Sequence, residues 1–389
     1  MTETKNVPGS ARGAKESRPR MANLELLRCI AMMMVVVLHY LSKGGLLAEP
    51  ADSVMNAAQL TAWILEVFCI VAVNVYMMIS GYFLCNTSFK LSRLIKLWLQ
   101  VWFYSVGVGM VAAFTGILPA EECDTHYFLS LLFPVSMGHY WFLTAYIFLY
   151  VALPLISMAV QRMTKEQLRF VVLALLFVFC LLKSILPFRL EMDGQGYDCI
   201  WYLCVFMAAA YIRKFGVSLL KKRWQCILLY VGACLAMLAE TLCLQQIYLK
   251  TGSLGRMVTV AIEYNHIFVF LAAVGLFLTF QMTSVSGQVS GVINRVAPYT
   301  LGVYLLHENL GVRYAWQKWL WADRASGVFG VIIYTLTAMV IVFVIGIFVD
   351  FIRSLIMKGL NRLFGCMGWY RKLLGGLEKA DNLFREKRE

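Results

Sequence analysis

The chain has 389 residues, of which 60% are hydrophobic and only 15% are charged, and its mean hydropathy is +0.71. A soluble globular domain has roughly 45–50% apolar and about 25% charged residues, so this composition excludes an ordinary soluble domain. The net charge of +13 is compatible with nucleic acid binding, but a basic excess beside apolar segments more often reflects orientation in a membrane. We therefore expect a lipid bilayer around the protein and no nucleic acid partner.

Apolar segments of roughly membrane-spanning length follow one another along the chain, which predicts an all-α, polytopic transmembrane helix bundle. About ten spans are expected, and an even number places both termini on the same side of the membrane. The predicted spans are 23–42, 58–84, 94–115, 139–160, 169–186, 199–213, 225–247, 259–281, 299–315 and 328–352.

The distribution of Lys and Arg gives this bundle an orientation. Most of them lie in the segments on the side of the N-terminus, which the positive-inside rule assigns to the cytoplasm. We accordingly predict a disordered basic cytoplasmic tail at 1–21, a transmembrane domain at 22–352 and a basic amphipathic cytoplasmic tail at 353–389. The opposite segments carry only Lys43, Lys183, Arg189, Lys250, Arg256, Arg313, Lys318 and Arg324.

The first span contains charged residues that an apolar helix would not be expected to keep. An ionised side chain at mid-bilayer costs at least about 2.5–3.5 kcal/mol, so such residues usually face the protein interior. Arg28 and His39 are eleven residues apart, which places them on one helix face about 16 Å apart along the axis, and Glu25 shares that face. A Glu–Arg ion pair with an interfacial histidine is one interpretation. The functional one is a polar path with His39 as a base and Arg28 as an anion holder.

Other polar residues within the spans are weaker candidates for function. Glu66 and His307 are slightly favoured over Glu240, Glu263, His266 and Glu308, since buried Glu–His pairs are also common structural contacts. Ser80 and its neighbour Gly81 indicate close helix packing, and Trp141 indicates either a membrane-interface anchor or a sugar-stacking residue. The 11 cysteines contain no C-x-x-C motif, and the five histidines form no metal-ligand pattern. We expect neither a disulfide framework nor a metal.

Several of these segments together resemble the membrane acyltransferase 3 family, which includes O-acetyltransferases of bacterial surface polysaccharides. Arg-x10-His in the first span is similar to the family's signature, and further matches follow in order along residues 22–352. These are "NVYMMISGYFL" (74–84), the basic "KLSRLIKLW" (90–98), "HYWFL" (139–143) and "TLGVYLLHENL" (300–310).

The resemblance implies a multi-pass protein of the bacterial cell membrane that uses cytoplasmic acyl-CoA, in particular acetyl-CoA, as the donor. It implies a hydroxyl of an extracytoplasmic glycan or lipid-linked sugar as the acceptor, with a separate extracytoplasmic transferase as a conceivable partner. Lys90, Arg93 and Lys96 are then expected to hold the phosphates of CoA. The family often has Arg-x-x-Arg here, so Lys96 departs from the pattern. His39 would be either a general base or the carrier of the acyl group.

A transporter or flippase for an amino acid, glycan or lipid-linked sugar is the alternative, because an interior polar stripe suits either function. No internal repeat or pair of broken helices supports it. Thioester consumption would separate the two, since only the enzyme consumes acyl-CoA.

Overall fold

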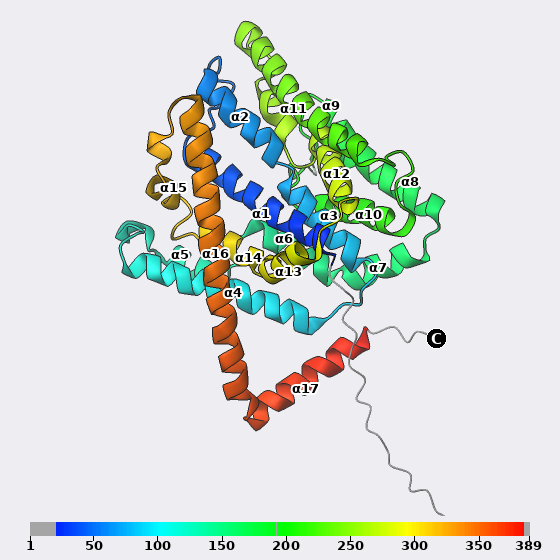
Figure 1. Cartoon of the computed structure of the whole chain (residues 1–389), viewed down its shortest axis with the longest axis vertical. Helices are drawn as coiled ribbons and strands as arrows, with labels where there is room; N and C mark the ends of the chain where they lie inside the picture. The colour runs from blue at the N-terminus through cyan, green and yellow to red at the C-terminus, as the bar shows by residue number, and fades with distance from the viewer. Residues whose placement is uncertain (1–20, 192, 385–389) are drawn as a thin grey trace, which may run out of the picture.

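The computed structural model describes residues 21–191 and 193–384, and within these ranges the chain folds into helices without any strand (Figure 1). An all-α bundle is therefore confirmed. The predicted tail at 1–21 lies, except for Met21, outside the described residues.

The first helix runs through the middle of the bundle. Helix α1 (Ala22–Lys43) packs against α2 (Ala57–Cys69) and α3 (Ala72–Leu84), and also against α12 (Ile267–Gln281), α14 (Thr300–His307) and α16 (Gly327–Gly365). Its apolar side chains are fully buried at Leu24, Leu27 and Val36. Because α1 is covered on most sides by protein, its polar residues face other helices, as predicted from their cost in a bilayer.

The remaining helices surround this centre. The long ones are α4 (Leu91–Phe114), α8 (Lys165–Leu176), α10 (Cys199–Phe215) and α11 (Arg223–Thr251), together with the bent pair α6 (Trp141–Val151) and α7 (Leu153–Arg162). The short ones are α5 (Thr125–Leu132), α9 (Leu182–Ile185), α13 (Gly287–Val296) and α15 (Trp316–Trp319), and α17 (Gly368–Leu383) follows α16.

Seven helical segments of the described chain are long and apolar enough to cross a membrane, or eight if α6 and α7, bent by 58°, count as one span. The protein is thus a multi-pass membrane protein by composition and length, while the count of ten and the orientation stay predictions. The prediction of a continuous ninth span over 299–315 is wrong, because α14 ends at His307 after eight residues. The expected sixth span corresponds to α10, with 17 residues.

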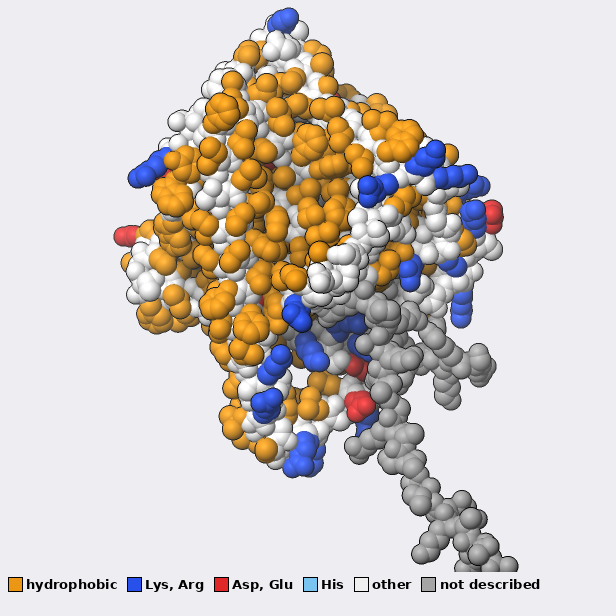
Figure 2. Space-filling model, viewed as in Figure 1, with side chains coloured by type: hydrophobic (Ala, Val, Ile, Leu, Met, Phe, Trp, Pro, Cys, Tyr) orange, Lys and Arg blue, Asp and Glu red, His pale blue; other side chains and the backbone are white. Residues whose placement is uncertain are grey.

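The outer surface has the polarity of a membrane protein. Figure 2 shows a broad apolar face, with Lys and Arg gathered near its margins. The two ends of the bundle are named as follows. The basic end is the one at which α1 and α4 begin and α16 ends. The distal end is the one at which α1 ends and α6 and α16 begin. Large apolar side chains such as Phe329, Ile333 and Phe348 of α16 are exposed between the two ends, as expected for helices in contact with lipid.

Helices α3 and α10 pack closely at Gly81, where the small residues Ser80 and Gly81 predicted a close approach. A Cβ on Gly81 would lie 2.9 Å from the backbone of Phe206, so only glycine permits this approach of α3 to α10.

The predicted domain boundary at 352 falls within a helix and stays a prediction. Helix α16 continues without interruption to Gly365, and α17 then returns towards the beginning of α4 (Figure 1).

Candidate active site

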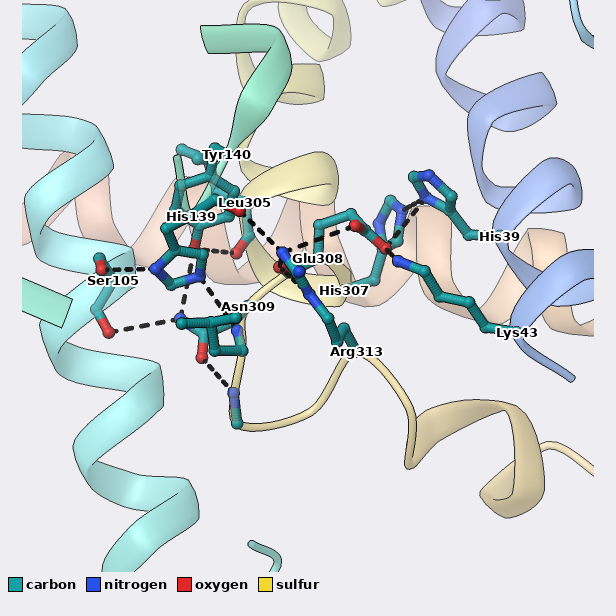
Figure 3. Close-up of polar contacts among 12 residues, drawn as sticks. His39, Lys43, Ser105, His139, Tyr140, Leu305, His307, Glu308, Asn309 and Arg313 are labelled. Carbon is teal, nitrogen blue, oxygen red and sulfur yellow. Dashed lines mark hydrogen bonds and ion pairs between the residues drawn. The ribbon is translucent and has the colours of Figure 1, made fainter. Parts of the chain in front are cut away.

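The last turns of α1 bring His39 and Lys43 to the end of α14. These two residues are four apart and therefore share a helix face. The His39 Nδ1 atom lies 2.9 Å from His307 Nε2 and 3.2 Å from a carboxylate oxygen of Glu308 (Figure 3). A residue from the first span thus meets a pair of residues almost 270 positions later in the chain.

The hydrogen bonds define which ring nitrogens carry protons. His307 Nδ1 lies 2.6 Å from the carbonyl oxygen of Val303, which can only accept, so this nitrogen donates and Nε2 of the neutral ring is an acceptor. His39 Nδ1 must then donate towards His307 Nε2 and Glu308. In neutral His39 the proton therefore sits on Nδ1, and Nε2 carries a free lone pair.

The Glu308 carboxylate is the electrostatic centre of this cluster. Its side chain is only 4% exposed, and the ammonium of Lys43 contacts the same oxygen that faces His39. The Arg313 guanidinium lies 3.8 Å from the other oxygen. A carboxylate buried to this extent requires such compensation, and the two cations keep it ionised beside the imidazole.

The chain immediately after α14 is held in an irregular shape by side chains. Arg313 donates to the carbonyl oxygens of Glu308, at 2.9 Å, and His139, at 2.8 Å. The Trp316 indole donates to the carbonyl oxygen of His307 at 3.1 Å. These contacts satisfy the backbone acceptors that are exposed where the helix ends, and they fix the position of His307 and Glu308.

A second polar cluster supports the same turn from the side of α4 (Figure 3). The Asn309 amide donates to the carbonyl oxygens of Tyr104 and Ser105 at 3.0 and 3.3 Å. The His139 ring accepts from the backbone N–H of Leu310 at 3.0 Å and contacts the Ser105 hydroxyl on its other side. Because Asn309 and His139 are fully enclosed, with 0% and 3% exposure, they are positioning residues of the turn.

The cluster also has the composition of a metal site. Ligand atoms of His39, His307 and Glu308 lie within 4.8 Å of one another, a set that Zn²⁺ accepts elsewhere. However, Lys43 and Arg313 already neutralise the carboxylate, and a divalent cation would be repelled by both. We interpret the cluster as a proton-handling group, and the expected lack of a metal stays a prediction.

Two cavities meet at His39. The inner cavity, of about 70 Å³, is almost entirely apolar and follows α1 from Met32 through Val35 to His39, with Tyr76 and Phe142 opposite. The outer cavity, of about 460 Å³, has His39, Lys43 and Glu308 on one wall and polar residues of the distal end on the others. His39 borders both cavities together with Leu38, Trp141 and Tyr264, and among these four it is the residue with a basic side chain.

The outer cavity has an aromatic wall and an uncompensated carboxyl group. The rings of Trp141 and Tyr264 stack at a centroid distance of 5.6 Å, and Tyr197 lies 4.4 Å from Trp141. Glu66 lines the same cavity, is only 5% exposed, and its Oε2 atom has no hydrogen-bond partner among the described residues. Aromatic faces and unpaired carboxyl oxygens are groups that bind the faces and hydroxyls of polyols.

The predicted phosphate-binding residues line a third cavity, of about 810 Å³, at the basic end. Lys90, Arg93 and Lys96 all border it, at the beginning of α4. Asp381 of α17 borders it as well. Although partial burial favours the neutral acid, hydrogen bonds from Ser92 lower the pKa of the Asp381 carboxyl below its ordinary value.

The structure separates the other members of the predicted α1 stripe from His39. Glu25 and Arg28 form an ion pair at 3.0 Å near the basic end, about 16 Å from His39 along the helix axis. The Arg28 side chain is 30% exposed, and the inner cavity begins one turn beyond it, at Met32. Ser80 is half-buried on α3 beside the closely packed Gly81. Their roles in function stay predictions.

Several residues of the cluster were not among the predicted site residues. Lys43, Arg313, His139 and Asn309 were missed, and Glu308 was considered only as a weak candidate. Two signals were present in the sequence: Lys43 follows His39 by four positions, and "HEN" (307–309) is a polar run that interrupts an apolar segment.

The other intramembrane acidic and histidine residues form structural contacts. Glu263 pairs with Lys183 and accepts from Gln195 at 2.9 Å. His266 lies 3.5 Å from Glu240. The side chains of Glu263 and His266 thus have different partners, although the two residues are only three positions apart.

Comparison with protein families decides the kind of protein. The model of the acyltransferase 3 family, described as an acyltransferase domain, matches residues 21–349. The chain belongs to this family. It is therefore an acyltransferase with a multi-pass, all-α membrane domain. Comparisons with curated proteins and with solved structures gave no match.

Membership in the acyltransferase 3 family also bears on the alternative function. A transporter or flippase would use the polar residues of the interior for passage, whereas an acyltransferase needs a base beside two substrate sites. His39, with a free lone pair and access to two cavities, has the geometry of such a base.

Proposed function

We propose that the protein is an O-acyltransferase of the bacterial cell membrane. It moves an acetyl or similar short acyl group from cytoplasmic acyl-CoA to a hydroxyl of an extracytoplasmic glycan or lipid-linked sugar. The observation that carries this proposal is the place of His39, which borders both cavities and is held at Nδ1 by His307 and Glu308.

The donor would approach from the basic end. Its phosphates would lie near Lys90, Arg93 and Lys96, and its thin pantetheine arm would follow the narrow apolar cavity along α1 towards His39. Arg28, oriented by Glu25 at 3.0 Å, stands between these two regions. There it would attract the negatively charged donor to the entrance, so its role is binding and not proton transfer.

The acceptor would occupy the outer cavity. Trp141 and Tyr264 offer a flat apolar wall for the face of a sugar ring. Glu66 offers a carboxyl oxygen for a hydroxyl group next to the one that reacts. The reacting hydroxyl would then lie against His39 Nε2.

The chemical step then needs one base. His39 Nε2 takes the proton of the acceptor hydroxyl, and the hydroxyl oxygen attacks the carbonyl carbon of the thioester. The new C–O bond forms, the C–S bond breaks, and the CoA thiolate takes the proton back from Nε2. The Glu308 carboxylate, 3.2 Å from Nδ1, stabilises the imidazolium that exists between these events. Because both substrates can reach His39 at once, we favour direct transfer over an acyl-histidine intermediate.

The test is thioester cleavage by purified protein in phosphatidylcholine nanodiscs. CoA release from acetyl-CoA is followed by chromatography, because the 11 cysteines would react with thiol reagents. We expect slow cleavage by the wild type and at least about a 100-fold loss with His39→Gln. The exposed His126 of α5 provides the control, since His126→Gln should keep the full rate.

Two results would count against the proposal. One is a folded His39→Gln protein that cleaves acetyl-CoA as fast as the wild type. The other is a wild-type protein that neither binds nor cleaves acetyl-, propionyl- or butyryl-CoA. That result would favour the alternative function of a transporter.

A further inference from the structure

The C-terminal segment from Asp350 onwards lies outside the part of the chain that matches the family, 21–349, yet it builds much of the cavity at the basic end. The part of α16 beyond the family match, residues 350–365, is called the α16 extension. It contributes Arg353, Lys358 and Asn361 to the cavity, and α17 contributes Leu373 and Leu377. The cavity of about 810 Å³ thus lies between α4, the end of α16 and α17. Figure 2 shows an opening between these elements.

Helix α17 is attached to the beginning of α4 at a defined position. The Asp381 carboxylate accepts hydrogen bonds from the Ser92 backbone N–H, at 3.0 Å, and from the Ser92 hydroxyl. The ring of Phe384 packs edge-to-face on Phe89 at a centroid distance of 5.1 Å. A polar cap and an aromatic contact hold the far end of the segment, so the three elements form a closed frame (Figure 1).

Several cations of the frame form no direct ion pair among the described residues. Arg353 is neutralised by Asp350 through two hydrogen bonds. By contrast, Lys90, Lys96 and Lys358 make no ion pair within the described part of the chain, although all three border the cavity. The carboxylates of Glu378 and Asp381 also border the cavity, and Asp381 interacts electrostatically with Lys90, so they offset part of this positive charge. The positive charge that remains is repulsive, and an anionic ligand between the cations removes that cost.

We propose that the α16 extension and α17 complete the donor site, with Lys358 binding the phosphates of the nucleotide part of acyl-CoA together with Lys90 and Lys96. This inference rests on the proposed function. It adds that a segment beyond the family domain determines affinity for the nucleotide, while the thioester end of the donor is bound elsewhere, near His39.

The experiment compares two donors in phosphatidylcholine nanodiscs: acetyl-CoA, and S-acetylpantetheine, which lacks the nucleotide and all phosphates. We expect Lys358→Ala to raise the KM for acetyl-CoA about 5- to 10-fold and to leave the KM for S-acetylpantetheine unchanged. Lys372 of α17 is exposed and does not border the cavity, so Lys372→Ala is the matched control. Removal of residues 366–389 should have the same donor-selective effect in a larger measure.

The two donors separate the inference from the proposed function. Suppose that the wild type cleaves both thioesters and that Lys358→Ala changes the KM for the two donors equally or not at all. This result would overturn the inference and leave the acyltransferase function standing. No cleavage of either donor by wild type, together with no binding or cleavage of propionyl- or butyryl-CoA, would overturn both. An effect of Lys358→Ala that appears only when phosphatidylglycerol is added to the nanodiscs would assign the cavity to a lipid headgroup and also overturn the inference.

Discussion

Replacement of Glu308 by glutamine removes the charge that faces His39 while the side-chain shape is kept. The carboxylate lies 3.2 Å from His39 Nδ1, and at an effective dielectric constant of about 20 a full imidazolium charge at that distance is stabilised by about 5 kcal/mol. That energy corresponds to roughly 10³- to 10⁴-fold in rate. Lys43 and Arg313 share the carboxylate, so we expect the lower value, about 10³-fold in kcat.

The assay is the initial rate of CoA release from acetyl-CoA at saturation, for Glu308→Gln and for Glu166→Gln. Glu166 is an exposed residue in the first turn of α8, and its substitution should leave the rate unchanged. A folded Glu308→Gln protein that keeps more than about a fifth of the wild-type kcat would refute the charge argument, since that loss is below 1 kcal/mol.

Stability can be separated from catalysis at the same position. Glu308→Gln leaves the Lys43 ammonium, 17% exposed, without its partner, and breaking a buried pair in this way typically costs about 3–5 kcal/mol. We expect Lys43→Met combined with Glu308→Gln to recover part of the lost thermal stability and none of the lost activity. Recovery of activity would show that the carboxylate acts only through folding.

Three further substitutions test other parts of the account. Asn309→Ala should lower both the melting temperature and kcat, because it removes the amide that joins the turn to the carbonyl groups of Tyr104 and Ser105 and leaves the buried N–H of Gly311 without its acceptor, a loss of about 1–3 kcal/mol that thermal unfolding in detergent would measure. Glu66→Gln should keep acetyl-CoA cleavage within about twofold while raising the KM for methyl glycosides offered as acceptors about tenfold; an unchanged KM with glycosides that are acetylated would contradict its placement in the acceptor site. Gly81→Val should destabilise the protein by about 1–3 kcal/mol because its Cβ would meet the backbone of Phe206, whereas Gly107→Val, with open space around it, should unfold near the wild-type temperature.

Local periodicity predicted the features that depend on single helices. The repeat of apolar segments indicated the bundle, and the 100° advance per residue placed Glu25, Arg28 and His39 on one face. The ion pair between Glu25 and Arg28 at 3.0 Å confirms that local geometry.

The partners of His39 depend on contacts across the whole chain, which periodicity cannot supply. Glu308 contacts His39 because α14 ends at His307 and the chain then turns. Hydrogen bonds from the Arg313 and Asn309 side chains hold that turn in place. A window of apolar residues extended the span to 315 because the residues after the turn are apolar again. For the same reason the sequence predicted an amphipathic tail at 353–389 but not the attachment of Asp381 to Ser92.

The central claim is that a donor from the basic end and an acceptor from the distal end meet at His39. Its most direct measurement uses sealed proteoliposomes with acetyl-CoA, which does not cross the bilayer, added only outside. The fraction of molecules with the C-terminal segment facing out is determined by the accessibility of a C-terminal tag. Turnover that rises in proportion to this fraction, and that is absent in His39→Gln, is the predicted result. Turnover that rises with the opposite fraction would contradict the account.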